Sequence, residues 1–84
     1  MKINTVTQER IDYLIDSAII EVSTIFDKCT VVAVKTIDGF VLVESSACVD
    51  PANYDENMGK EICINKIKDK LWKLEGYKLQ LEQE

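Results

Sequence analysis

Two β-branched runs flank an Asp-Gly pair, and this feature constrains the fold more than any other. The runs read CTVVAVKTI (residues 29–37) and FVLVESSA (residues 40–47). Asp-Gly between such runs predicts a β-hairpin with a two-residue type I′ turn, because both central residues of that turn need positive φ. Pairing outward from the turn places Ile37 opposite Phe40 and Val34 opposite Val43.

Both faces of this predicted hairpin are apolar. An antiparallel sheet on the surface of a protein normally keeps one face polar. The second face therefore needs a cover, either the C-terminal helix of the same chain or another subunit. In the predicted register one face carries Val31, Ala33, Ile37, Phe40 and Leu42, and the other carries Val32, Val34, Val41 and Val43.

The segments on either side of the hairpin have helical periodicity. Before it, apolar residues recur at three- and four-residue spacing and predict a helix over residues 6–26, with Thr5 and Gln8 as a capping box. After it, a narrower stripe predicts a helix that ends at Leu74, with Gly76 as the residue that stops it. The first stripe contains Ile11, Leu14, Ala18, Val22 and Ile25, and the second contains Ile64, Ile67, Leu71 and Leu74.

The last residues, YKLQLEQE, alternate in polarity and predict a short closing strand beside the hairpin. The 84 residues suffice for one domain with a small core. The predicted fold is a single α+β domain over residues 1–84. It has a long N-terminal helix, a β-hairpin that forms a small antiparallel sheet, a C-terminal helix and the closing strand.

The segment CVDPANYDENMGKEIC (residues 48–63) is the least regular part of the chain. Asp50-Pro51 is typical of a helix start, with Asp as the N-cap and Pro at the first helical position. Asn and Asp residues then favour turns, so we expect one helical turn, a break near Gly59 and a long helix afterwards. Asn53 and Tyr54 place an amide beside an aromatic ring in this loop, where recognition residues are often found.

The composition excludes several classes of function. The chain has no histidine, no glycine-rich phosphate loop, and three cysteines without a C-x-x-C pair. We therefore expect no catalytic residues, metal or cofactor, but a non-enzymatic binder with reduced thiols. The net charge of −5 argues against DNA and RNA polymers, but it allows a small anionic ligand. No long apolar run or signal-peptide core is present, so we expect a cytoplasmic protein without membrane contact.

The motifs CVDPANYD (residues 48–55) and LWKLEGY (residues 71–77) resemble the ending of a widespread family of small phage and prophage proteins. In that family a Cys-Val-Asp-Pro-x-Asn-Tyr-Asp segment precedes a helix reading Ile/Leu-Trp-x-Leu-x-Gly-Tyr. The likeness covers roughly residues 48–80 and, more loosely, the helix and hairpin before them. The group is taken to include the first type of Thoeris anti-defence proteins, which sequester the cyclic ADP-ribose signal made by bacterial TIR-domain enzymes.

The resemblance implies a phage anti-defence protein in an infected or lysogenic bacterial host. It would hold a cyclic ADP-ribose isomer, and cyclic oligonucleotides at a separate site, without degrading them, and so block Thoeris defence. Sponge-type members of the family are symmetric oligomers that bind the nucleotide between subunits. This implies a dimer-based homo-oligomer, such as a hexamer. The alternative is an interaction module that inhibits or scaffolds a host protein.

The predicted ligand-binding residues are Asn53, Tyr54, Phe40, Lys68, Lys70 and Arg10. Tyr54 would stack on adenine or, alternatively, pack over the helix as a half-buried aromatic, and Phe40 would stack on adenine or belong to the core or an interface. Asn53 would read a base edge or ribose, or form only an Asx turn. The family's pocket is associated with arginine, whereas Arg10 is the sole arginine here. Phosphate contacts would therefore fall to Arg10, to backbone N–H groups, or to a lysine of the second helix, which could equally be a solvated face.

Overall fold

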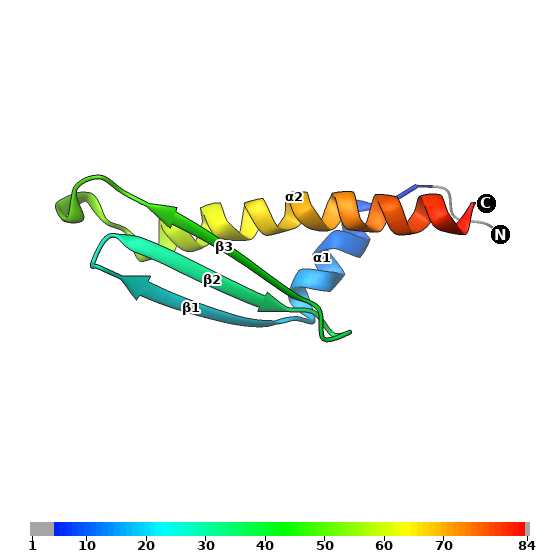
Figure 1. The fold of residues 1–84 in the computed structure, drawn as a ribbon, viewed down its shortest axis with the longest axis horizontal. Coiled ribbons are helices and arrows are strands. Elements are labelled where there is room, and N and C mark those ends of the chain that lie inside the picture. The colour runs from blue at the N-terminus through cyan, green and yellow to red at the C-terminus, as the bar shows by residue number, and fades with distance from the viewer. Residues whose placement is uncertain (1–4, 84) are drawn as a thin grey trace.

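The computed structural model describes residues 5–83 and contains two helices, three strands and one 3₁₀ turn. In chain order they are α1 (Gln8–Asp16), β1 (Ile19–Ile25), β2 (Cys29–Lys35), β3 (Val41–Ala47), η1 (Pro51–Asn53) and α2 (Glu56–Glu82). The strands form an antiparallel sheet in the order β1-β2-β3, and α2 packs across β2 and β3 (Figure 1). A 27-residue helix is about 40 Å long, whereas a seven-residue strand spans about 23 Å. The helix therefore extends past the sheet, and the molecule measures 53 × 20 × 18 Å.

The predicted long N-terminal helix is wrong, although the protein is α+β. Helix α1 has only nine residues, and its N-cap is Thr7 rather than Thr5, because the Thr7 hydroxyl accepts a hydrogen bond from Arg10 N at 3.2 Å. Residues 19–25 form β1 instead. Their sequence, IIEVSTI, is rich in β-branched residues and fits both a helical and an alternating pattern. Pairing with β2 along all seven residues selects the strand.

The predicted turn between β2 and β3 is also wrong, because the loop is one residue longer. Thr36 N donates to Phe40 O and Gly39 N donates to Thr36 O, both at 2.8 Å. The loop is therefore Ile37–Gly39, with Gly39 at φ +90°, as in three-residue hairpin loops. The observed register pairs Val34 with Leu42 rather than with Val43. A shift of one residue moves every β3 side chain to the other face, so Leu42 is buried and Val43 is exposed.

Two errors concern α2. The helix does not stop at Gly76 but continues to Glu82, so the predicted closing strand is absent from residues 77–82. The expected helical turn exists as η1, capped by Asp50, whose carboxylate accepts from Ala52 N at 2.9 Å. The break that follows lies at Tyr54 and not at Gly59. The reason is that Asp55 caps α2 directly, accepting from Asn57 N at 2.9 Å and Met58 N at 3.2 Å.

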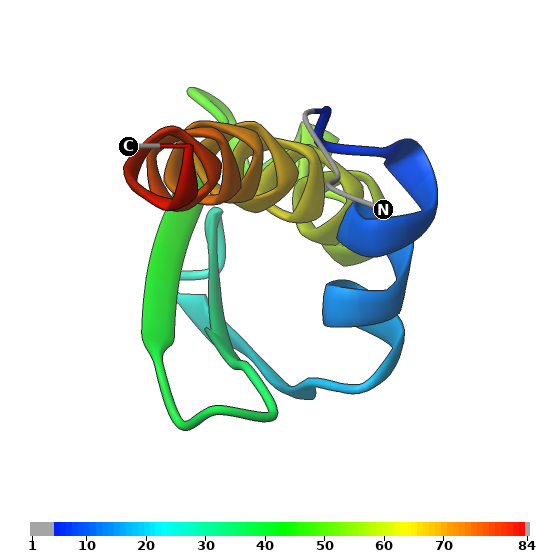
Figure 2. The same cartoon turned by 90° about the vertical axis from the view of Figure 1, so that its right-hand side faces the viewer.

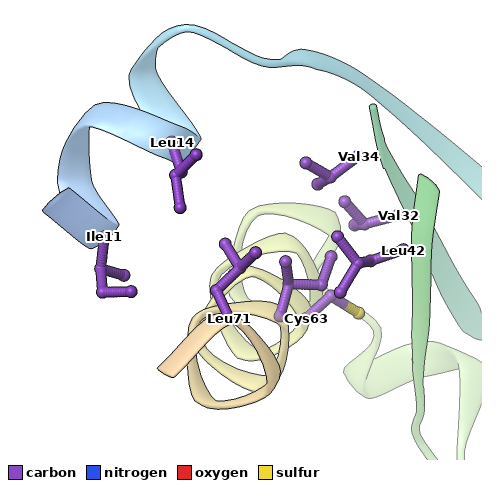
Figure 3. Packing of buried hydrophobic residues seen from close by; sticks show 8 residues of the cluster. Ile11, Leu14, Val32, Val34, Leu42, Cys63 and Leu71 are labelled. Carbon is purple, nitrogen blue, oxygen red and sulfur yellow. The ribbon is translucent and has the colours of Figure 1, made fainter. Parts of the chain in front are cut away.

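The hydrophobic core lies between α1, α2 and one face of the sheet, as Figure 3 shows. Helix α2 therefore covers one face of the sheet from within the chain. Within residues 5–83 no element covers the other face, where Ile19, Val41 and Val43 are exposed. The buried apolar residues are Ile11, Leu14, Val32, Val34, Leu42, Cys63, Ile67 and Leu71.

Neither helix described here has the length and apolar character that a membrane span requires.

Candidate functional site

The six predicted ligand-binding residues lie in four different segments of the chain. Asn53 and Tyr54 lie in the connection that follows β3, whereas Phe40 immediately precedes β3. The whole of β3, about 23 Å long, separates Asn53 and Tyr54 from Phe40, and they occupy opposite ends of the sheet (Figure 1). Lys68 and Lys70 belong to α2, and Arg10 belongs to α1.

Tyr54 fastens the loop to the sheet. Its hydroxyl lies 2.7 Å from the Thr30 hydroxyl and 2.8 Å from the Thr24 hydroxyl. Thr24 donates its own proton to Glu56 Oε2 at 2.6 Å. Since each hydroxyl has one proton, Tyr54 donates to Thr24, and Thr30 donates to Tyr54. The result is a directed chain of hydrogen bonds that begins at a fully buried threonine and ends on a carboxylate.

This geometry predicts that Tyr54→Phe destabilises the protein. The change keeps the ring but leaves the buried Thr30 hydroxyl without its acceptor, which should cost about 1–3 kcal/mol. The melting temperature should then fall by about 4–24 °C, measured by circular dichroism. Tyr77→Phe is the matched control, since Tyr77 is largely exposed and should melt like the wild type. Equal melting of the two variants would contradict the fastening role.

The cleft beside Tyr54 is small, and Asp55 is the one charged residue among those that line it. It has a volume of about 120 Å³, and Asn53, Asp55 and Met58 are among its lining residues. Among the lining residues there is no lysine or arginine. This cleft can supply amide and hydroxyl groups to a ligand, but it lacks a cation for a phosphate.

A larger cleft brings Phe40 together with Lys70. It has a volume of about 370 Å³ between β3 and α2, and it is lined by Phe40, Val41, Leu42, Val43, Lys70, Lys73 and Leu74. Phe40 is 56% exposed. Lys70 forms an ion pair with Glu44 on β3, whereas Lys73 has no such partner among the described residues. An open aromatic ring beside two ammonium groups can stack on a planar base and neutralise a phosphate.

Phe40 also borders a second cleft, on the side of α1. This cleft, of about 300 Å³, reaches Arg10 and shares Leu74 with the first. Arg10 Nε donates to Glu75 Oε1 at 2.5 Å, and its guanidinium lies 5.7 Å from the centre of the Tyr13 ring. The hydrogen bond to Glu75 raises the pKa of Arg10. Arg10 therefore joins α1 to α2, and a ligand in this cleft would meet a guanidinium that is already paired.

The structure thus groups Phe40 with Lys70 and Arg10 and leaves the other predicted residues apart. Lys68 lies 3.8 Å from Asp12 and lines none of these clefts. Lys73 lines the cleft of Lys70, but the sequence offered it only as one of several lysines of the second helix and not among the six predicted residues. Its spacing of three residues from Lys70 was the available signal, because such residues share a helix face.

The remaining groups offer little reactive chemistry. All three cysteines are free thiols, and burial raises the pKa of the Cys63 thiol. No group of three or more Cys, Asp or Glu side chains within residues 5–83 is arranged to hold a metal ion. The clefts around Phe40 are therefore the best candidates for a binding site.

Comparison with known proteins identifies a family. The family model described as phage protein (N4 Gp49/phage Sf6 gene 66) matches residues 6–82, which include both helices and the whole sheet. None of the curated proteins and none of the solved structures compared with the chain matches it. Because the match covers nearly the whole chain, this protein belongs to the phage protein (N4 Gp49/phage Sf6 gene 66) family.

Proposed function

We propose that this phage protein captures a cyclic nucleotide signal of bacterial immunity without degrading it, and thereby blocks the TIR-based Thoeris defence. The ligand class is a cyclic ADP-ribose isomer, with cyclic oligonucleotides as further candidates. The observation that carries the proposal is the cleft in which Phe40 stands open beside Lys70 and Lys73. A base would stack on Phe40, while the two lysines would meet the phosphates.

The proposal includes a dimer-based homo-oligomer. Asn53 and Tyr54 lie too far from Phe40 to contact the same small ligand within one chain. A neighbouring copy could bring its own Asn53 and Tyr54 to the Phe40 cleft, so that the loop of one copy and the cleft of another enclose the nucleotide. The exposed apolar face of the sheet supports association, because a monomer would leave this face in water.

Calorimetric titration with cyclic ADP-ribose isomers and cyclic oligonucleotides tests the proposal. At least one should bind, and heating the complex should release it unchanged, as judged by chromatography. Phe40→Ala and the double variant Lys70→Ala/Lys73→Ala should each weaken binding about ten- to hundred-fold. Lys60→Ala is the control, because Lys60 is exposed on the same helix and lines none of the clefts.

Each other outcome contradicts part of this proposal. A chemically altered nucleotide would identify an enzyme. Wild-type affinity in the Phe40→Ala variant would move the site elsewhere. Absence of binding to every cyclic nucleotide would favour the second candidate function.

The second candidate is an interaction module for a host protein, favoured by the end of the molecule opposite Phe40. There Phe26 is 86% exposed and has φ +56°, a conformation that bulky residues adopt only under strain. Cys48 N donates to Lys28 O at 2.9 Å and so brings the β1–β2 turn beside Val49, which is 94% exposed. A strained turn with exposed apolar side chains is the kind of surface that a protein partner covers.

A further inference from the structure

The two edges of the sheet differ in how they are protected. At the β3 edge, Lys66 Nζ donates to Ser45 O at 2.9 Å, and Lys70 pairs with Glu44. Both lysines come from α2, which lies along this side of the sheet (Figure 2). Most of the β1 edge lies away from α2. The Thr24 hydroxyl contacts Tyr54 and Glu56, but no described residue from outside the sheet is hydrogen-bonded to the backbone of Ile19–Thr24. At the β3 edge a lysine therefore meets an outward backbone carbonyl, whereas at the β1 edge no described residue does so.

The hydrogen-bond pattern shows which β1 groups face outward. Thr36 N donates to Phe40 O, so even-numbered β2 residues bond to β3 and odd-numbered ones bond to β1. The β1 residues opposite those odd-numbered residues are Ile19, Glu21, Ser23 and Ile25. The backbone N–H and C=O groups of Ile20, Val22 and Thr24 consequently point away from the sheet.

The β1 edge also lacks the features that keep edge strands apart. Its sequence, IIEVSTI, contains no proline, glycine or lysine, and all seven residues pair with β2 without a bulge. Ile19 at one end is 65% exposed, and Ile25 at the other end is exposed as well. An edge without a bulge, with exposed apolar residues and with unpaired outward backbone groups, is a template for another strand.

We infer that β1 of one copy pairs antiparallel with β1 of a second copy, about a two-fold axis at Val22. This register pairs all seven residues and joins the outward-facing Ile20 of each copy to Thr24 of the other, and Val22 to Val22. On the uncovered face it places Ile19 opposite Ile25 in two apolar pairs. Glu21, the only charged residue of β1, lies opposite Ser23, so the pairing brings no like charges face to face.

The pairing is self-limiting. A two-fold axis perpendicular to the sheet keeps both α2 helices on the same face of a continuous six-stranded sheet. Both β1 edges are then paired, and the outer edges are the two β3 strands, where Lys66 occupies the outward carbonyl of Ser45. The assembly therefore closes as a dimer instead of growing along its edges. It needs no nucleotide, so this inference stands apart from the ligand chemistry of the proposed function.

Sedimentation equilibrium of the full chain tests the pairing. The wild type should associate into particles of two copies, about 19 kDa or twice 9.6 kDa, or a multiple of two. Ser23→Glu places two Glu–Glu pairs across the axis and should raise the dimer dissociation constant at least about tenfold. Ser23→Lys should tighten the dimer, because each lysine faces Glu21 of the other copy. The double variant Glu21→Lys/Ser23→Glu should restore association.

A proline pair provides a second readout. Val22→Pro removes the outward N–H at the centre of the axis and should shift the protein toward monomers. Val43→Pro removes an outward N–H at the β3 edge and should leave the dimer intact. Circular dichroism checks that each variant is folded. If Val22→Pro does not fold, the association of the Ser23 variants decides the test. A wild type that is still monomeric at about 100 μM, a concentration high enough to detect a weak interface, would overturn the inference. Insensitivity of the dimer to the Ser23 charges would overturn it as well. Loss of nucleotide binding with an intact dimer would count only against the proposed function.

Discussion

Gly59→Ala should lower the stability of the protein by about 3 kcal/mol, although glycine-to-alanine changes inside helices usually stabilise. A Cβ atom at residue 59 would lie 2.2 Å from Thr30 Oγ1 and 2.8 Å from Thr30 Cβ. Thr30 is fully buried and its hydroxyl is held by Tyr54. The change therefore combines overpacking with a broken hydrogen bond. The melting temperature should fall by roughly 12–24 °C.

Gly76→Ala is the matched control in the same helix. Nothing lies within 4 Å of a Cβ atom at residue 76, so this change should raise stability by about 0.5–1 kcal/mol. The opposite signs separate steric contact from helix propensity. Thr30→Ala combined with Gly59→Ala should recover part of the loss, because the nearest clashing atom is gone. If Gly59→Ala melted at or above the wild-type temperature, α2 could not lie this close to β2.

Ile67→Ala should cost about 2–5 kcal/mol. Ile67 is fully buried in the core that joins both helices to the sheet, so the change leaves a cavity that three elements would have to fill. For a domain of this size the loss is a large part of the total stability. Urea denaturation followed by circular dichroism should show a lower midpoint with little change in slope.

Ile62→Ala tests the same substitution in the same helix at a position that is 40% exposed. Its cost should stay below about 1 kcal/mol, because less apolar surface is buried there. Similar midpoints for the two variants would mean that the core does not lie along the stripe of Cys63, Ile67 and Leu71.

The two errors that concern the sheet share one physical origin. Ile19, Ile20, Val22 and Ile25 satisfy a helical spacing as well as an alternating one, and only their pairing with β2 distinguishes the two. Asp38-Gly39 correctly marks the reversal between β2 and β3 but suits loops of two and of three residues. Local patterns therefore located the elements of the hairpin, whereas the long-range contacts set strand identity and register.

The candidate site was predictable only in part for a related reason. Phe40 and Lys70 are thirty positions apart in the sequence, and the packing of α2 on β3 brings them into one cleft. The sequence also assigned Asn53 and Tyr54 to that site, because they are adjacent to each other in a polar loop. The Tyr54 hydroxyl is instead hydrogen-bonded to Thr30 and Thr24, a role that no sequence spacing reveals.

The overhang of α2 beyond the sheet changes how the protein behaves during size measurement. A compact chain of 84 residues has a radius of gyration of about 12 Å, whereas this one has 15.1 Å. A single copy therefore experiences more friction than a sphere of its mass and leaves a gel-filtration column ahead of globular standards. Early elution alone would therefore not count the copies, because the elongated shape of a single copy also causes it. The number of copies has to come from a measurement of mass.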